Sequence, residues 1–254
     1  MKNIKQTLKE RLQAGKNVLG TWCLLPSEAV VNVIAKAGLD FVLIDLEHGA
    51  ISPECALRMV MAAQADGSEA VIRVSCNDES EVAKALDIGS NGVIVPHIET
   101  PRECRDALSF IKYPPSGVRG FSPYVRSGGY AQTKGYVSKE NQRILSGIII
   151  EGLEGIVNID SIIADTRLDL VYIGAYDISV ALGVPGEISN PKVVKIIKEC
   201  VKKIRAHKKA AGALFHSEQE LRLFKSIGIQ FLCYRVDSDI LYSAFNTIVN
   251  NFGR

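Results

Sequence analysis

Residues 41–75 read FVLIDLEHGAISPECALRMVMAAQADGSEAVIRVS, and this stretch decides the fold. It begins and ends with short apolar runs, 41–46 and 70–75, which are rich in β-branched residues and typical of buried strands. Between them, 53–65 has the apolar spacing of a helix, and Ser52 is suited to cap its first turn. Strand, helix and strand in this order form a βα repeat, which predicts a parallel sheet.

The same alternation runs along the whole chain. The predicted strands are 18–23, 41–46, 70–75, 92–96, 147–152, 170–175, 212–215 and 229–236. The predicted helices are 27–37, 53–65, 78–88, 101–110, 155–165, 191–207, 217–227 and 238–250. Eight strands and eight helices predict a (β/α)8 barrel, the TIM barrel, as a single domain over residues 1–254. A doubly wound sheet is the alternative, but the regular repeat favours the closed barrel.

One interval interrupts this regular pattern. Residues 111–146 carry Pro, Gly, Ser, Tyr and Arg without a sustained helix or strand period. A connection of this length in a compact domain is usually functional or disordered. We therefore expect a long active-site loop at about 111–146.

The composition excludes several classes of partner. The chain has 254 residues with 30 Lys plus Arg against 28 Asp plus Glu, so its charge gives no basic face for nucleic acid or an anionic membrane. Its six cysteines are scattered without a C-x-x-C pair, which is typical of a reduced cytoplasmic protein. The charged segment 1–16 resembles no secretory leader, and we find no apolar run of membrane-spanning length. We expect a cytoplasmic protein that binds small molecules.

Two carboxylates are the strongest candidates for a metal site. The active site of a TIM barrel lies at the carboxyl ends of its strands. Glu151 and Asp177 end the neighbouring fifth and sixth strands, so both should point into one mouth. Two carboxylates, with water and substrate completing the shell, suit Mg²⁺ or Mn²⁺. Alternatively, each carboxylate caps a helix or pairs with a lysine.

Other polar residues end the strands as well. His48 is either a general base, because a histidine pKa lies near working pH, or an ordinary polar loop residue. Arg73 ends an apolar strand and therefore needs an anion, either a substrate carboxylate or Asp45. The remaining polar residues at these ends are Glu47, His97, Glu99, His216, Arg235 and Asp237.

The strand ends also exclude two kinds of chemistry. No lysine ends any of the predicted strands, which argues against a Schiff-base aldolase. The segments after the last two strands lack the glycines of a barrel phosphate site, so phosphorylated substrates are disfavoured. The electrophilic role would then fall to a metal ion.

A set of motifs resembles a known family. These are AGLDFVLIDLEHG, VIRVSCND, ALDIGSNGVIVPHIET, YPPSGVRG, NIDSI and IGAYDIS, in this order between about Gly20 and Pro191. Together they resemble the HpcH/HpaI family of metal-dependent pyruvate aldolases, which includes a branch that makes citrate for siderophores. The resemblance implies a homo-oligomer, from dimer to hexamer, of barrels that exchange their last helix.

The resemblance also assigns roles to residues of this chain. Glu151 and Asp177 would hold a divalent metal (Mg²⁺, Mn²⁺ or Co²⁺), which a 2-keto acid substrate chelates. Arg73 would bind the substrate and face the enolate oxygen. His48 and its partner Asp87 would be catalytic.

The same resemblance places the substrate carboxylate. It would lie on backbone amides after the sixth strand, at Ala175 and Tyr176 and near Asp177.

Three positions depart from the family pattern. Ile149 stands where the aldolases usually have Gln, so a hydrogen bond to the keto acid is lost. Tyr176 replaces Ala in the usual Gly-Pro-Ala-Asp loop, and His97 replaces an apolar residue. The metal and enolate residues are therefore retained while their surroundings differ.

Three functions follow from these observations. The first is a carbon–carbon lyase that acts through a metal-bound enolate of pyruvate or a related 2-keto acid. The second is a citrate synthase-like condensation of oxaloacetate with acetyl-CoA, for which His97, Arg119 or Arg126 would supply a cationic contact. The third is a metal-binding homologue without catalysis, against which the retained metal carboxylates argue.

Overall fold

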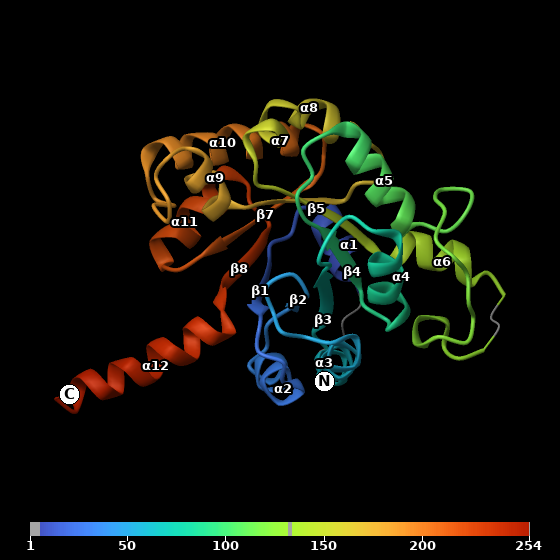
Figure 1. Ribbon diagram of the computed structural model, residues 1–254, viewed down its shortest axis with the longest axis horizontal. Coiled ribbons are helices and arrows are strands. Elements are labelled where there is room, and N and C mark those ends of the chain that lie inside the picture. Colours follow the sequence, from blue (N-terminus) through green and yellow to red (C-terminus); the bar gives the residue numbers. More distant parts are fainter. Residues whose placement is uncertain (1–5, 132–133, 254) are drawn as a thin grey trace.

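The computed structural model describes residues 6–131 and 134–253 and forms a closed barrel of parallel strands (Figure 1). The strands are β1 (Val18–Cys23), β2 (Phe41–Asp45), β3 (Glu69–Arg73), β4 (Gly92–Val95), β5 (Leu145–Ile150), β6 (Leu170–Ile173), β7 (Ala210–Phe215) and β8 (Phe231–Val236). Each strand pairs in parallel with the next, and β8 pairs with β1 to close the sheet. The predicted TIM barrel is confirmed.

Helices lie outside the strands, most of them between one strand and the next (Figure 1). They are α1 (Leu8–Gln13), α2 (Glu28–Lys36), α3 (Pro53–Ala65), α4 (Glu79–Asp87), α5 (Pro101–Ile111), α6 (Tyr136–Arg143), α7 (Leu153–Val157), α8 (Ile159–Ile162), α9 (Ala175–Ala181), α10 (Pro191–Ala206), α11 (Glu218–Ile227) and α12 (Asp237–Asn251), with a short 3-10 helix at Arg126–Gly128. The Ser52 hydroxyl accepts from the Cys55 amide, which confirms the predicted cap of α3. The single helix predicted over 155–165 is wrong: it is two short helices that meet at Asn158, whose side-chain amide donates to the Glu99 carbonyl at 2.9 Å.

The barrel interior is a packed core. The rings of Phe41 and Phe231 stack with centroids 4.0 Å apart, and Leu8 and Leu12 of α1 pack against the same interior cluster. Nearer the carboxyl ends of the strands, the Trp22 indole N–H donates to the Tyr172 hydroxyl at 2.8 Å. Because α1 covers one end of this core, ligands have access from the carboxyl ends of the strands.

The interval 111–146 is only partly a loop. It contains α6 and the 3-10 helix, and its aromatic residues Tyr113, Phe121 and Tyr136 pack edge to face or tilted against one another. Arg119 lies over the Tyr113 ring at 4.4 Å and binds Asp87 of α4. Side-chain packing therefore orders the described parts of this segment, although its sequence shows no period. Its role at the active site stays a prediction.

Helix α12 leaves the barrel, extends away from it and ends at Asn251, near the carboxyl terminus (Figure 1). Among the described residues, no helix combines the length and apolar character needed to cross a membrane. The cytoplasmic location stays a prediction from the cysteine spacing.

Candidate active site

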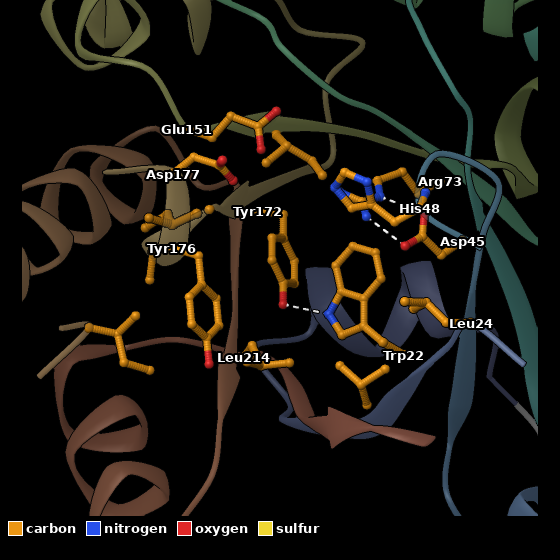
Figure 2. Close-up of a pocket in the computed structure, with 16 residues that line it drawn as sticks. Trp22, Leu24, Asp45, His48, Arg73, Glu151, Tyr172, Tyr176, Asp177 and Leu214 are labelled. Atoms are coloured by element: carbon orange, nitrogen blue, oxygen red, sulfur yellow. Dashed lines mark hydrogen bonds and ion pairs between the residues drawn. The ribbon is translucent and has the colours of Figure 1, made fainter. Parts of the chain in front are cut away.

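A cavity of about 310 Å³ opens at the carboxyl ends of the strands (Figure 2). Its charged and polar lining residues are Asp45, His48, Arg73, Glu151, Tyr176 and Asp177. Its apolar floor and walls include Trp22, Leu24, Ile149, Tyr172, Leu214 and Val236. The structure therefore brings most of the predicted site residues into one cavity.

Glu151 and Asp177 lie at neighbouring strand ends, as predicted. Glu151 directly follows β5, Asp177 lies in the first turn of α9 after β6, and Figure 2 shows both carboxyl groups pointing into the same part of the cavity. Glu151 is buried, and its Oε1 accepts a hydrogen bond from the His97 amide at 2.8 Å. Burial raises the pKa of Glu151, and the negative charges of Asp177 and Glu47 raise it further against the lowering effect of His97. A cation would relieve this crowding of negative charge.

The donors at this position fit a divalent metal with an open shell. No lysine of the described chain pairs with Glu151 or Asp177, so the alternative of a lysine ion pair is not realised. A Cβ atom at Gly174 would lie only 2.6 Å from the Glu151 Cβ and 3.1 Å from its Oε2, so glycine leaves room for this carboxylate. Within residues 6–131 and 134–253, no three His, Cys, Asp or Glu side chains form a metal-binding group. A metal here would take two protein carboxylates and leave other positions to water and substrate, as Mg²⁺ tolerates.

Arg73 ends β3 and is held by carboxylates. Its Nε and Nη2 donate to the two oxygens of Asp45 at 2.9 and 2.6 Å, and its Nη1 forms an ion pair with Glu47 at 2.9 Å. Asp45 is fully buried, and the guanidinium lies 4.5 Å from the centre of the Trp22 ring. The anion that balances Arg73 within the chain is therefore Asp45, while the guanidinium still lines the cavity.

His48 and Asp87 are placed differently. His48 lines the cavity beside Arg73 (Figure 2), and its backbone amide lies 3.3 Å from Oδ1 of Asp45. Asp87 is the last residue of α4, binds Arg119 at 2.8 Å and is not among the described residues that line the cavity. No hydrogen bond joins His48 to Asp87 within the described chain. The catalytic role of Asp87 stays a prediction, and Asp45 is the carboxylate that contacts the His48 segment.

His97 connects two acidic residues, Glu47 and Glu151. Its Nε2 lies 2.7 Å from Glu47 and its Nδ1 lies 2.9 Å from Glu151. Burial alone would lower the pKa of His97, but the charges of Glu151, Glu47 and Asp177 outweigh it and raise that pKa. His97 also has a left-handed backbone with φ +56°, which directs its amide to Glu151. The residue that departs from the family pattern therefore holds the Glu151 carboxylate in place.

Glu220 belongs to a second hydrogen-bonded group, with His216 and Tyr176, instead of closing a helix cap. The spacing of Ser217 and Glu220 predicts a capping box at the start of α11. The Ser217 hydroxyl does accept from the Glu220 amide at 3.2 Å, but the Glu220 carboxylate accepts from the His216 amide at 2.6 Å. Glu220 therefore supports His216, whose ring contacts Tyr176 in the cavity wall. In the sequence, the one signal for this hydrogen-bonded group is the position of His216 at the end of a predicted strand.

Fold and site together define a (β/α)8 barrel whose cavity carries paired carboxylates and a braced arginine at the carboxyl ends of the strands. Residues 19–242 match the family described as HpcH/HpaI aldolase/citrate lyase, and the chain belongs to this family. Two of its relatives in sequence are named as aldolases, which are lyases.

Three similar proteins illustrate the family. The chain is 30% identical over 240 residues to the hydroxypyruvate/pyruvate aldolase of Sagittula stellata, covering 94% of this chain and 95% of that protein. It is 30% identical over 251 residues to the 4-hydroxy-2-oxo-heptane-1,7-dioate aldolase of Escherichia coli, covering 98% and 96%. The solved structure of the citrate synthase SbnG is 28% identical with a TM-score of 0.89, covering 96% of each chain.

Proposed function

We propose that this protein is a metal-dependent carbon–carbon lyase that cleaves or forms 4-hydroxy-2-keto acids through an enolate of pyruvate or a related 2-keto acid. The observation that carries the proposal is the placement of Glu151 and Asp177 in one cavity with Arg73 and His48. The two aldolase relatives, each aligned over nearly the whole chain, support the same reaction class.

Glu151 and Asp177 would hold the metal, for which Mg²⁺, Mn²⁺ and Co²⁺ are the candidates. When bound, such an ion supplies Lewis acidity that polarises the keto group and balances the enolate charge. Gly174 and the His97 amide orient Glu151 for this task. The backbone amides of Ala175 and Tyr176 would bind the substrate carboxylate, as the family resemblance implies.

The residues of the chain then account for the movement of charge and protons. In cleavage, the His48 ring accepts the proton of the C4 hydroxyl, the C3–C4 bond breaks, and its electron pair forms the enolate at C2 and C3. Arg73 stabilises the developing negative charge because its guanidinium is already oriented by Asp45. Protonation at C3 completes pyruvate, and the C4 carbon leaves as an aldehyde. The apolar floor around Trp22 limits water around the enolate.

This proposal predicts two measurable activities of the wild-type protein. With pyruvate and Mg²⁺, Mn²⁺ or Co²⁺ in D2O, the methyl protons should exchange with solvent, which proton NMR follows. A panel of 4-hydroxy-2-keto acids should release pyruvate, measured with a coupled lactate dehydrogenase. Both activities should disappear with a chelator and return when metal is restored. The proposed function would be contradicted if the protein showed no exchange and no cleavage with any of the three metals.

One observation favours a second candidate, the condensation of oxaloacetate with acetyl-CoA. Ile149 is buried and lines the cavity, so an apolar wall stands where the aldolases usually have Gln. The likeness to the citrate synthase SbnG points in the same direction. Release of free CoA thiol from oxaloacetate and acetyl-CoA, without cleavage of hydroxy-keto acids, would favour this function over the lyase.

We further propose that α12 packs against another copy of the chain, as the implied exchange of the last helix requires. Leu241, Phe245 and Ile248 follow helical spacing, and Phe245 and Ile248 are each 64% exposed. A stripe of exposed large apolar residues on one helix is typical of a protein interface.

The test replaces Phe245 and Ile248 together by Asp. Because charges on an apolar interface are costly to bury, the molar mass in solution should fall to that of the monomer, as measured by light scattering after size exclusion. The control, Asn246→Asp with Asn250→Asp, adds the same charge to the same helix outside the stripe and should keep the wild-type mass. A monomeric wild type, or a Phe245/Ile248 variant of unchanged mass, would refute the proposed interface.

A further inference from the structure

The wall of the cavity opposite Arg73 and His48 carries a hydrogen-bonded pair. Tyr176 lies in the first turn of α9 and lines the cavity, and Figure 2 shows its ring on the side away from Arg73. Its hydroxyl lies 3.1 Å from Nε2 of His216, directly after β7, and the two rings meet at 85°. The proposed proton transfer and enolate stabilisation use neither side chain.

The surroundings of His216 favour one direction for this hydrogen bond. The Glu220 carboxylate accepts from the His216 amide at 2.6 Å and stands 3.5 Å from its Nδ1. A carboxylate at this position favours the tautomer with its proton on Nδ1, which leaves Nε2 as an acceptor. The Tyr176 O–H then donates to Nε2, and its oxygen presents lone pairs to the cavity. This part of the wall therefore offers a hydrogen-bond acceptor to a ligand.

The charges of the cavity disfavour a second carboxylate on the substrate. Among the described lining residues Arg73 is the permanent cation, and its fork already binds Asp45. The proposed metal would balance Glu151 and Asp177, so no cation of this lining is left for a second substrate carboxylate. Near Tyr176, the Glu220 carboxylate adds negative charge, whereas the Asp239 carboxylate is paired with Arg235. An anionic group that reached this wall would meet repulsion and an acceptor oxygen, whereas a hydroxyl could donate to that oxygen.

We propose that Tyr176, held in place by His216 and Glu220, selects the electrophile: an aldehyde that bears a hydroxyl group is favoured over one that ends in a carboxylate. This inference rests on the proposed lyase function and names the substrate class of the same cavity. Tyr176 contacts the substrate, whereas His216 and Glu220 are positioning residues that act through it. Cleavage of 4-hydroxy-2-oxo-heptane-1,7-dioate, for which a relative is named, would release a four-carbon aldehyde ending in a carboxylate. We expect this chain to disfavour that substrate.

The test measures kcat/KM for the condensation of pyruvate with matched aldehydes. Lactaldehyde against propanal isolates a C2 hydroxyl, glyceraldehyde against lactaldehyde isolates a C3 hydroxyl, and 4-oxobutanoate against butanal isolates a carboxylate. In the wild type, at least one hydroxyl should raise kcat/KM by about 10-fold, the effect of one net hydrogen bond, and the carboxylate should lower it. Tyr176→Phe should reduce the hydroxyl ratio to about 1 because the acceptor oxygen is gone.

His216→Leu should lower the same ratio, since the tyrosine hydroxyl loses the partner that orients it. A purely structural role of His216 would lower kcat/KM for both members of a pair equally and leave the ratio unchanged. The control Tyr242→Phe removes the hydroxyl of a tyrosine on α12 that is 69% exposed and should keep the wild-type ratio.

Two results would overturn the inference while leaving the lyase intact. In the first, the wild type exchanges pyruvate protons but prefers neither the C2 hydroxyl nor the C3 hydroxyl of the aldehyde. In the second, the Tyr176→Phe variant keeps the wild-type ratios. Failure of the proposed function is seen separately, as absence of pyruvate proton exchange in the wild type, which involves no aldehyde.

Discussion

Glu151→Gln and Asp177→Asn should each lower metal-dependent turnover by on the order of 10³-fold, since Lewis-acid stabilisation is worth several kcal/mol. Each amide keeps the shape of the side chain but removes one of the two charged oxygen donors. A single carboxylate cannot hold a hard cation against water. Gln at 151 retains an oxygen that can accept from the His97 amide, so the fold should survive.

The measurement needs a readout besides turnover. After treatment with a chelator, Mn²⁺ is titrated into each protein and free Mn²⁺ is counted by electron paramagnetic resonance. Wild type should bind Mn²⁺ measurably more tightly than either variant. Glu154→Gln is the matched control, because this exposed glutamate lies three residues further along the chain in α7. Wild-type Mn²⁺ affinity and turnover in the Glu151 or Asp177 variant would remove these residues from the metal site.

Most of the fold could be predicted because buried parallel strands are short apolar runs with a characteristic length. The expected strand 18–23 coincides with β1, and the expected helix 53–65 coincides with α3. Helix α1 is not predicted because its sequence is mostly charged and contributes two core residues, Leu8 and Leu12, which are too few to show a helical period. Helix α9 was missed because its seven residues are too few to establish a period. Short helices depend on contacts that a local pattern does not contain.

The sequence predicts which residues line the site, but not which of them contact one another. The rule that strand ends converge brought Glu151, Asp177, Arg73 and His48 into one cavity, as expected. The sequence indicated Asp45 as one of two anions for Arg73 but could not decide between Asp45 and a substrate carboxylate, because only the register of β2 and β3 sets Asp45 directly beside Arg73.

The contact between Tyr176 and His216 was equally hidden from the sequence. The two residues are separated by 40 positions, and the parallel pairing of β6 and β7 brings α9 and the end of β7 together. A position at the end of a strand identifies such residues as candidates for the site. Their side-chain partners depend on tertiary packing.

Arg73→Lys should lower kcat/KM by about 10²-fold or more, although it keeps the positive charge, because a preorganised charge-stabilising donor is lost. The guanidinium donates to both oxygens of Asp45 and also forms an ion pair with Glu47, so these contacts hold it in a fixed position. An ammonium is a single flexible point charge and cannot reproduce this fork. It would lie either with Asp45 or toward the enolate, and not at both.

The same substitution should also reduce stability. Asp45 is fully buried, and a carboxylate that loses part of its hydrogen bonding costs about 1–3 kcal/mol in the free energy of unfolding. Urea unfolding measures this loss of unfolding free energy. The value of kcat/KM is measured well below the urea midpoint, so that a loss of activity does not reflect unfolding. Arg58→Lys, which changes an exposed ion pair with Glu54 on α3, is the control and should leave both quantities near wild type. If Arg73→Lys loses stability but keeps kcat/KM within a few-fold, Arg73 only balances Asp45, and the enolate charge must be stabilised by other groups of the cavity.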